Sequence, residues 1–266
     1  MNVVGDETFY CKTNNGHILK PIIEAYSNCT KFIILNITKF AINSYVLGEN
    51  HSILIKSTFP ASKFDKYVCT NNINIMVATD ELSMNTKNIK RKNTTHMFIL
   101  KSAPDQFAIS VSSNDENDNS NISRIKVTEV FDSVVLDTNF KYVHSYKINS
   151  KDLNRTIKEL SKISDEIHML GFNTHIVFRY VEEGIVKKEY KFNTARADEV
   201  DKTAHTNVIY SKIVESKLLN NIAKAITVAK QVVISVSAGL PIKIEIDSGA
   251  IIMSDIFIKT VDMMTT

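Results

Sequence analysis

Lysine and arginine recur at helical spacing in this chain, and phosphate binding is the chemistry that such cations could carry out. Arg155, Lys158 and Lys162 lie three or four residues apart, and Lys217 and Lys224 lie seven apart, almost two helical turns. Flexible cations on an exposed helix face can hold phosphates without reading bases. Cations near a helix C-terminus also suit the macrodipole and are often merely solvated, so each helix alone leaves both interpretations open. The cations expected on these faces are Lys20, Lys87, Lys90, Arg91, Arg155, Lys158, Lys162, Lys217 and Lys224.

Four amphipathic segments must position these cations. Apolar residues three or four apart predict helices over residues 17–26, 80–91, 152–164 and 216–229. The helix patterns start near Gly16, Asp80, Ser150 and Glu215, at nearly equal intervals, and strand-like segments follow each one. This periodicity predicts two halves, each doubled again. The residues expected to form the buried stripes are Leu19, Ile22, Ile23, Tyr26, Leu82, Ile89, Leu153, Ile157, Leu160, Leu218, Leu219, Ile222, Ile226 and Ala229.

Short β-branched or aromatic runs, separated by turn residues, dominate the rest of the chain. They predict an α+β fold of two similar domains, residues 1–130 and 142–266, joined by the weakly patterned segment 131–141. The strands predicted in the first half are 32–37, 40–45, 51–55, 73–77, 97–100, 107–111 and 122–127. Those in the second half are 142–148, 175–180, 186–192, 232–236, 242–246 and 256–259. Residues 112–120 and 194–206 are predicted to be surface loops.

The motif content argues against catalysis. The sequence has no glycine-rich phosphate loop, no nucleophile elbow and no His-Glu-x-x-His motif, and it has only seven glycines. Cys11, Cys29 and Cys69 show no metal-ligand spacing, and the seven histidines are scattered. We therefore expect a protein that is not an enzyme and that uses no metal and no cofactor.

Charge and hydropathy restrict the partners. The formal net charge of +3 is mild for 266 residues, so a polyanion would have to be met by a local patch. No apolar run approaches the ~18–20 residues that span a bilayer, and the N-terminus lacks the features of a secretory signal. We therefore expect no membrane partner. Because the three cysteines show no CxxC or metal-ligand spacing, we also expect a reducing compartment.

Segments in both halves match a known family in order and spacing. Residues 18–25 (ILKPIIEA), 51–55 (HSILI) and 64–69 (FDKYVC) resemble the first domain of the eukaryotic-type DNA sliding clamp, the proliferating cell nuclear antigen family. The second-half segments, which resemble the third helix, the fourth helix and the penultimate strand region of that family, are 153–164, 217–224 and 237–245. The resemblance covers roughly residues 9–261.

The resemblance implies a ring of three subunits, each with curved antiparallel sheets outside and helices inside, around double-stranded DNA held without sequence specificity. It also implies a processivity factor that tethers a DNA polymerase and other replication and repair enzymes and that is served by a clamp loader. The expected location is the nucleus, or the viral replication site of an infected cell. Carried over by position, the DNA-facing residues are Lys20, Lys87, Arg155, Lys158, Lys217 and Lys224. Helix geometry adds Lys90, Arg91 and Lys162, whereas Met84 stands where the family usually has a lysine.

The resemblance also implies a groove for short peptide motifs of partner proteins. Its wall would include Leu47, His51, Leu54, Pro241 and Ile258, covered by the linker 131–141 through Val134, Val135 and Leu136. Two of these residues, Leu54 and Ile258, would equally suit a core. The linker lacks the family's usual proline, so we expect the motifs that it accepts to differ.

Subunit closure would pair residues 120–128 of one subunit with residues 187–193 of the next, which removes two unpaired sheet edges. The charged residues Lys187, Lys188 and Glu189 could equally protect the edge of a monomer.

Three functions stay open at this point. The first is a homotrimeric replicative clamp. The second is a clamp-like subunit of a checkpoint complex, or a viral transcription or processivity factor, acting in a different oligomeric state. The third is an unrelated α+β enzyme.

Overall fold

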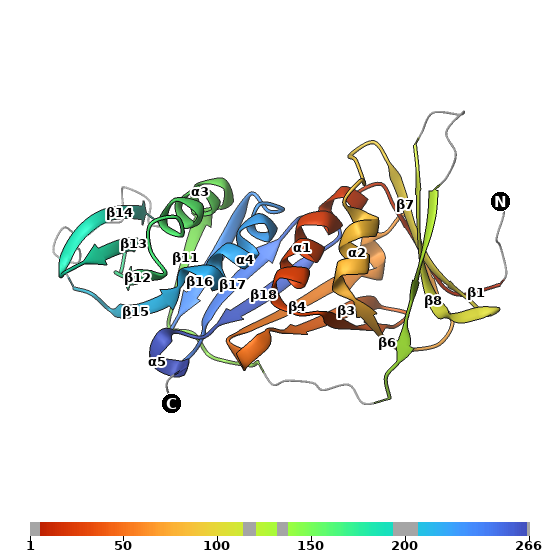
Figure 1. Cartoon of the computed structure of the whole chain (residues 1–266), viewed down its shortest axis with the longest axis horizontal. Helices are drawn as coiled ribbons and strands as arrows, with labels where there is room; N and C mark the ends of the chain where they lie inside the picture. The colour runs from red at the N-terminus through yellow and green to blue at the C-terminus, as the bar shows by residue number, and fades with distance from the viewer. Residues whose placement is uncertain (1–5, 114–120, 132–137, 194–206, 265–266) are drawn as a thin grey trace. The chain divides into compact units, whose positions relative to one another are not determined.

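The computed structural model describes residues 6–113, 121–131, 138–193 and 207–264, which form two compact units (Figure 1). Unit 1 comprises Met1–Leu47, Ile55–Leu136 and Ser248–Ser254, and unit 2 comprises Gly48–Leu54, Asp137–Asp247 and Asp255–Thr266. Two short segments, 48–54 and 248–254, thus belong to the unit that is built mainly from the other half of the chain. The domain limits predicted above stay predictions.

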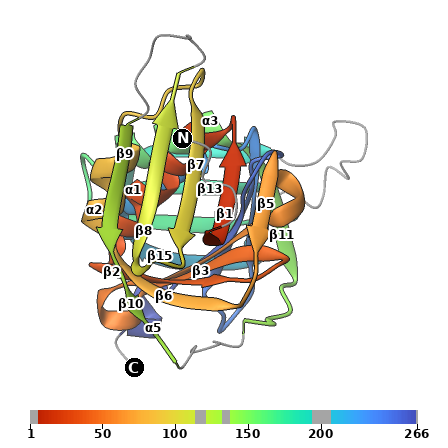
Figure 2. The ribbon, with the colours of Figure 1, turned by 90° about the vertical axis from the view of Figure 1, so that its right-hand side faces the viewer.

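Unit 1 combines two packed helices with two runs of strands. In one sheet the strand order is β5-β1-β7-β8-β9, which Figure 2 shows from its outer side, and in the other run it is β10-β6-β2-β3-β4. The elements are β1 (Glu7–Thr13), η1 (Gly16–Ile18), α1 (Leu19–Cys29), β2 (Phe32–Ile37), β3 (Ala41–Leu47), η2 (Glu49–His51), β4 (Ile53–Pro60), η3 (Ala61–Lys63), β5 (Lys66–Cys69), β6 (Ile73–Ala78), α2 (Thr79–Thr86), β7 (Thr94–Leu100), β8 (Ala103–Ser112), β9 (Asn121–Lys126) and β10 (Thr128–Glu129).

Unit 2 repeats this plan. Its strand orders are β14-β13-β12-β15 and β18-β17-β16-β11. The elements are β11 (His144–Asn149), α3 (Ser150–Leu160), β12 (Glu166–Gly171), β13 (His175–Glu182), β14 (Ile185–Asn193), β15 (Tyr210–Glu215), α4 (Ser216–Ile226), β16 (Gln231–Val236), β17 (Ile242–Asp247), β18 (Met253–Ile258) and α5 (Val261–Met264).

Equivalent hydrogen bonds at three helix starts confirm the predicted repetition. The backbone N–H of the first helical residue donates to the carbonyl just before a neighbouring strand: Thr79 to Lys31, Ser150 to Lys230, and Ser216 to Asp165. The Thr79 hydroxyl also donates to the carbonyl of Thr30, and the Ser150 hydroxyl donates to that of Ala229. A hydroxyl side chain thus makes the same kind of contact at the start of α2 in unit 1 and of α3 in unit 2.

The core of unit 1 lies where its two helices meet both runs of strands. The side chains that gather there are Leu19, Ile23, Tyr26, Ile33, Leu35, Ile42, Phe59, Leu82, Thr86, Met97, Phe107 and Ile109. Apolar residues from all of these elements exclude water together, and this burial is the main favourable term in folding. All strand pairs whose register is described are antiparallel, which confirms the predicted α+β class. Within the described residues, no helix is both long and apolar enough to cross a membrane.

Candidate nucleic-acid interface

The four long helices come as two packed pairs, α1 with α2 in unit 1 and α3 with α4 in unit 2 (Figure 1). Each pair buries one face and leaves the other to solvent. In α3, for example, Leu153, Ile157 and Leu160 have no exposed surface. The predicted apolar stripes are therefore confirmed, and they determine which side chains of each helix remain outside.

All of the predicted DNA-contacting cations are exposed. They are Lys20 on α1, Lys87, Lys90 and Arg91 at or beyond the end of α2, Arg155, Lys158 and Lys162 on or beyond α3, and Lys217 and Lys224 on α4. Pro21 occupies the third position of α1, where its missing N–H breaks no helical hydrogen bond. Exposure is required for phosphate contact but does not establish it, so the DNA-binding role of these residues stays a prediction.

Helix α2 is shorter than predicted. It ends at Thr86, whose hydroxyl donates to the carbonyl of Leu82 at 2.8 Å. The chain then turns: the N–H of Ile89 donates to the carbonyl of Thr86, and the side chain of Asn93 accepts from the N–H of Lys90 at 2.7 Å. These local polar bonds compete with the helical ladder. Lys90 and Arg91 therefore lie in a turn and not on a helix face.

Helix α1 extends three residues past its predicted end, to Cys29, whereas α3 and α4 end earlier than predicted. Helix α3 ends at Leu160, and the N–H groups of Ile163 and Ser164 both donate to its carbonyl at 3.0 Å, so Lys162 lies in the turn that follows. Helix α4 ends at Ile226, although Ala229 beyond it is buried as predicted. Of the predicted DNA-contacting cations, those on regular helix are thus Lys20, Arg155, Lys158, Lys217 and Lys224.

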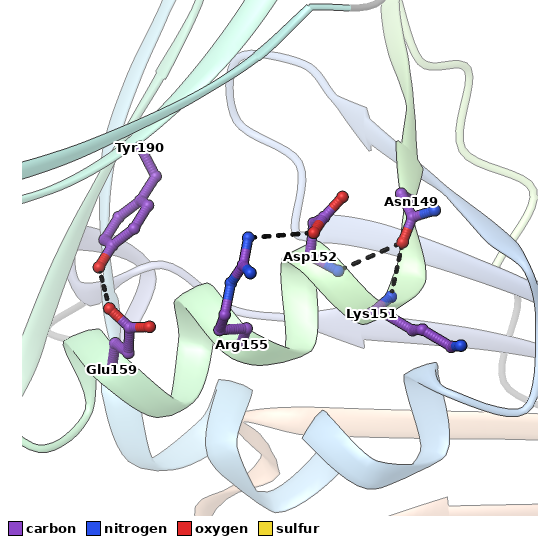
Figure 3. A network of polar contacts seen from close by, with 6 residues as sticks. All are labelled: Asn149, Lys151, Asp152, Arg155, Glu159 and Tyr190. Carbon is purple, nitrogen blue, oxygen red and sulfur yellow. Dashed lines mark hydrogen bonds and ion pairs between the residues drawn. The ribbon is translucent and has the colours of Figure 1, made fainter.

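Helix α3 is well capped and carries mixed charge (Figure 3). The side-chain oxygen of Asn149 accepts from the N–H groups of Lys151 and Asp152 at 3.0 and 3.3 Å. Such a cap satisfies N–H groups that have no partner within the helix. The Arg155 guanidinium contacts the Asp152 carboxylate at 3.1 Å, and both side chains are at least half exposed.

A second contact ties α3 to the edge strand β14. The Glu159 carboxylate accepts a hydrogen bond from the Tyr190 hydroxyl (Figure 3). It accepts another from the Lys188 ammonium, at 2.9 Å. Hydrogen bonds from Tyr190 and Lys188 lower the pKa of Glu159 below its ordinary value, so the carboxylate stays ionised near neutral pH. The sequence reasoning missed this contact because its partners lie about 30 residues apart on different elements, and no local spacing signals it.

The predicted groove residues differ in exposure. Leu47 and His51 are exposed, Leu54 and Pro241 are half-buried, and Ile258 is fully buried. Leu47 belongs to unit 1, whereas the other four belong to unit 2. Val134, Val135 and Leu136, which were predicted to cover the groove, lie outside the described residues. The groove therefore stays a prediction.

The two strands predicted to close a ring are both sheet edges. Within the part of the chain that the structure describes, β9 pairs with β8 alone and β14 pairs with β13 alone. Among their exposed apolar side chains are Ile122 on β9 and Ile185 and Val186 on β14. Both strands thus offer unpaired backbone groups and some apolar surface to another chain.

The described residues offer no arrangement suited to a metal ion. Among them, no group of three or more histidine, cysteine, aspartate or glutamate side chains gathers in one place. Burial raises the pKa of the thiols of Cys11 and Cys29, which disfavours the reactive thiolate.

Comparisons with known proteins agree with the resemblance. The model of the proliferating cell nuclear antigen N-terminal domain matches residues 8–140, half of the chain. A protein described as a DNA polymerase sliding clamp, from Nitrosopumilus maritimus (strain SCM1), is 32% identical over 92 residues, which cover 35% of this chain and 37% of the relative. The match thus spans little more than a third of that relative's length. Together with the four repeated helices and the antiparallel sheets, these matches show that the chain belongs to the proliferating cell nuclear antigen family of DNA sliding clamps.

Proposed function

We propose that this protein is a DNA sliding clamp, a processivity factor that encircles duplex DNA and tethers a DNA polymerase and other replication and repair enzymes. The observation that carries the proposal is the repeated design of the helices. Each of the two units presents a pair of helices whose buried faces pack inward. Exposed lysine or arginine lies on α1, α3 and α4, and Lys87 follows the last residue of α2. Membership of the sliding-clamp family gives this cationic surface its expected ligand.

Exposed lysines suit a protein that must slide. They attract phosphates through a salt-dependent, sequence-independent interaction, and they do not read base edges. Each contact is weak and quickly exchanged. Encirclement of the duplex, and not tight recognition, would therefore hold the protein on DNA. In this function the protein has no chemistry of its own.

Retention on a nicked circular duplex, compared with the same duplex after linearisation, tests encirclement. We expect the protein to stay on the circle and to leave the linear form through its ends. Equal retention on both forms would contradict encirclement, because simple groove binding does not depend on DNA ends.

The proposed ring is a homotrimer closed by antiparallel pairing of β9 from one subunit with β14 from the next. The edge positions of both strands support this arrangement. Sedimentation equilibrium should give three copies of the 30.0 kDa chain. A monomer that assembles only with other proteins would favour the second candidate, a subunit of a heteromeric checkpoint clamp or a viral factor of different stoichiometry.

The proposed partner site is the groove around Leu54, which is half-buried at the start of β4. Partners would insert a short motif with apolar side chains, because a groove of this kind binds a helical turn through apolar anchors. Leu54→Ser should weaken the binding of a polymerase-derived peptide at least tenfold in a calorimetric titration while leaving the oligomeric mass unchanged. Unaltered peptide affinity would remove Leu54 from the site.

Assembly by a clamp loader and location in the nucleus, or at a viral replication site, belong to the same proposal.

A further inference from the structure

Helix α3 carries two carboxylates along one edge of its row of cations. Lys151, Arg155 and Lys158 are exposed and lie three or four residues apart, so they share one face. Asp152 and Glu159 lie seven residues apart, almost two turns, and flank Arg155 at positions i−3 and i+4. Both carboxylates are therefore within helical reach of the same guanidinium.

The two carboxylates have different partners in the structure. Asp152 binds Arg155, whereas Glu159 is turned toward Tyr190 of β14 and accepts from its hydroxyl (Figure 3). Glu159 also accepts from the ammonium of Lys188 on the same strand. Lys188 and Tyr190 are alternate residues of one strand and therefore project from the same side of it. Glu159 thus has its ion pair with the edge strand, whereas the ion pair of Arg155 is with Asp152; Arg155 is still near enough to help lower the pKa of Glu159.

Releasing Glu159 would change the charge that α3 offers to DNA. An ionised carboxylate pairs with a cation three or four residues away on the helix surface, and Arg155 is such a cation. The exposed Asp152–Arg155 pair is weak enough to be exchanged for a phosphate. With a second carboxylate, Arg155 would be flanked by two negative charges, and DNA phosphates would be repelled from this part of the face.

We propose that Lys188 and Tyr190 are positioning residues for DNA binding, which hold Glu159 against β14 and so keep the Arg155–Lys158 face available to phosphates. The inference rests on the proposed function, because it requires α3 to face DNA. Lys188 itself needs no contact with the duplex in this arrangement.

A double-mutant cycle tests the proposal on the full-length protein. Fluorescence anisotropy would follow the binding of a labelled duplex over a series of salt concentrations. Lys188→Gln should weaken binding about three- to tenfold and lower the slope of log K against log salt by about 0.9 per subunit in contact, the effect of one lost phosphate contact. Glu159→Gln should bind as well as the wild type or better. The double variant should bind the duplex with the affinity of Glu159→Gln alone, because it lacks the carboxylate that Lys188 would hold.

Matched variants separate this role from others. Lys187→Gln makes the same charge change on the neighbouring residue of β14, which pairs with Glu182 and not with Glu159, so it should leave binding unchanged. Lys188→Arg keeps the positive partner and should retain wild-type binding. Tyr190→Phe removes one donor and should weaken binding in the same direction as Lys188→Gln. Tyr190→Phe also gives a test that does not depend on the folding of the Lys188 variant.

Two results would overturn the proposal. If Lys188→Gln weakens binding equally with and without the Glu159 carboxylate, Lys188 contacts phosphate directly. If Lys187→Gln has the same effect as Lys188→Gln, only the net charge matters. If the proposed function itself is wrong, the wild type will show no salt-dependent binding to duplex DNA. That outcome is distinct from the two results above. The oligomeric mass of each variant would show whether a change at β14 acts through subunit assembly instead.

Discussion

Reversing the charge of Lys158 and Lys224 together is the most informative perturbation of the proposed DNA-facing surface. Both side chains are exposed and lie in the last turns of α3 and α4, one on each helix of the unit 2 pair. If each lysine contacts one phosphate, Lys158→Glu with Lys224→Glu removes two contacts per subunit. The slope of log K against log salt should then fall by about 1.8 per subunit engaged, and affinity at fixed salt should fall about 10- to 100-fold.

The substitutions should leave the fold intact. A carboxylate in the last turn of a helix opposes the macrodipole at a cost of about 0.3–1 kcal/mol, which is small beside the ~5–15 kcal/mol that stabilises a typical domain. Loss of DNA binding could therefore not be attributed to unfolding. Circular dichroism and sedimentation would confirm an unchanged fold and mass.

The assay is the anisotropy titration of a labelled duplex over a series of salt concentrations. Lys63→Glu with Lys66→Glu serves as the matched control, because both residues are exposed and lie on η3 and β5, outside the four helices. If the helix variant keeps the salt slope of the control, the exposed faces of α3 and α4 do not contact phosphates, and the reasoning fails.

Four further perturbations test the packing and the surface. Leu153→Ala, in the core of unit 2, should cost about 2–5 kcal/mol, measured as a lower urea midpoint. Gly16→Ala should destabilise unit 1, because the new Cβ would lie 2.0 Å from the hydroxyl oxygen and 2.6 Å from the Cβ of Thr95; Thr95→Ala should rescue it only in part. Burial raises the pKa of Tyr26 from 10.0 to about 12, so the unfolded state ionises first and the free energy of unfolding should fall as pH rises through that range; Tyr26→Phe should flatten this dependence in urea titrations at several pH values. Met84→Lys, at an exposed position of α2, should raise the salt slope of DNA binding by about 0.9 per subunit; an unchanged slope would place α2 away from the duplex.

The helices were predictable because a strong apolar period determines them. Leu153, Ile157 and Leu160 form a stripe that only a helix can bury on one side, and all three are fully buried. Helix ends were less predictable, since they depend on local hydrogen bonds. The hydroxyl of Thr86 and the side chain of Asn93 end α2 and shape the turn after it, and neither bond has a periodic signal.

Five of the described strands were not predicted: β1, β5, β10, β12 and β15. β1 alternates buried Phe9, Cys11 and Thr13 with more exposed neighbours, so a period of two was present, but a cysteine and a threonine weaken it as an apolar pattern. β5 is a four-residue edge strand whose residues are all at least partly exposed, and it is held by its pairing with β1. Such strands are set by their partners more than by their own residues.

The candidate site was also predictable from the sequence only in part. Exposure of Lys158 and Lys224 followed from the position of the apolar stripe, because the two faces of an amphipathic helix exclude each other. The restraint on Glu159 did not follow, since Lys188 and Tyr190 reach it only through the tertiary packing of β14 against α3. Contacts between distant elements leave no mark in local spacing.

Electron cryo-microscopy of the protein assembled on duplex DNA tests the central claim most directly. We predict three copies around the duplex, with the exposed faces of α1, α2, α3 and α4 turned toward the phosphates. A reconstruction in which DNA lies against the sheets, or in which these helix faces pack against protein, would contradict the account.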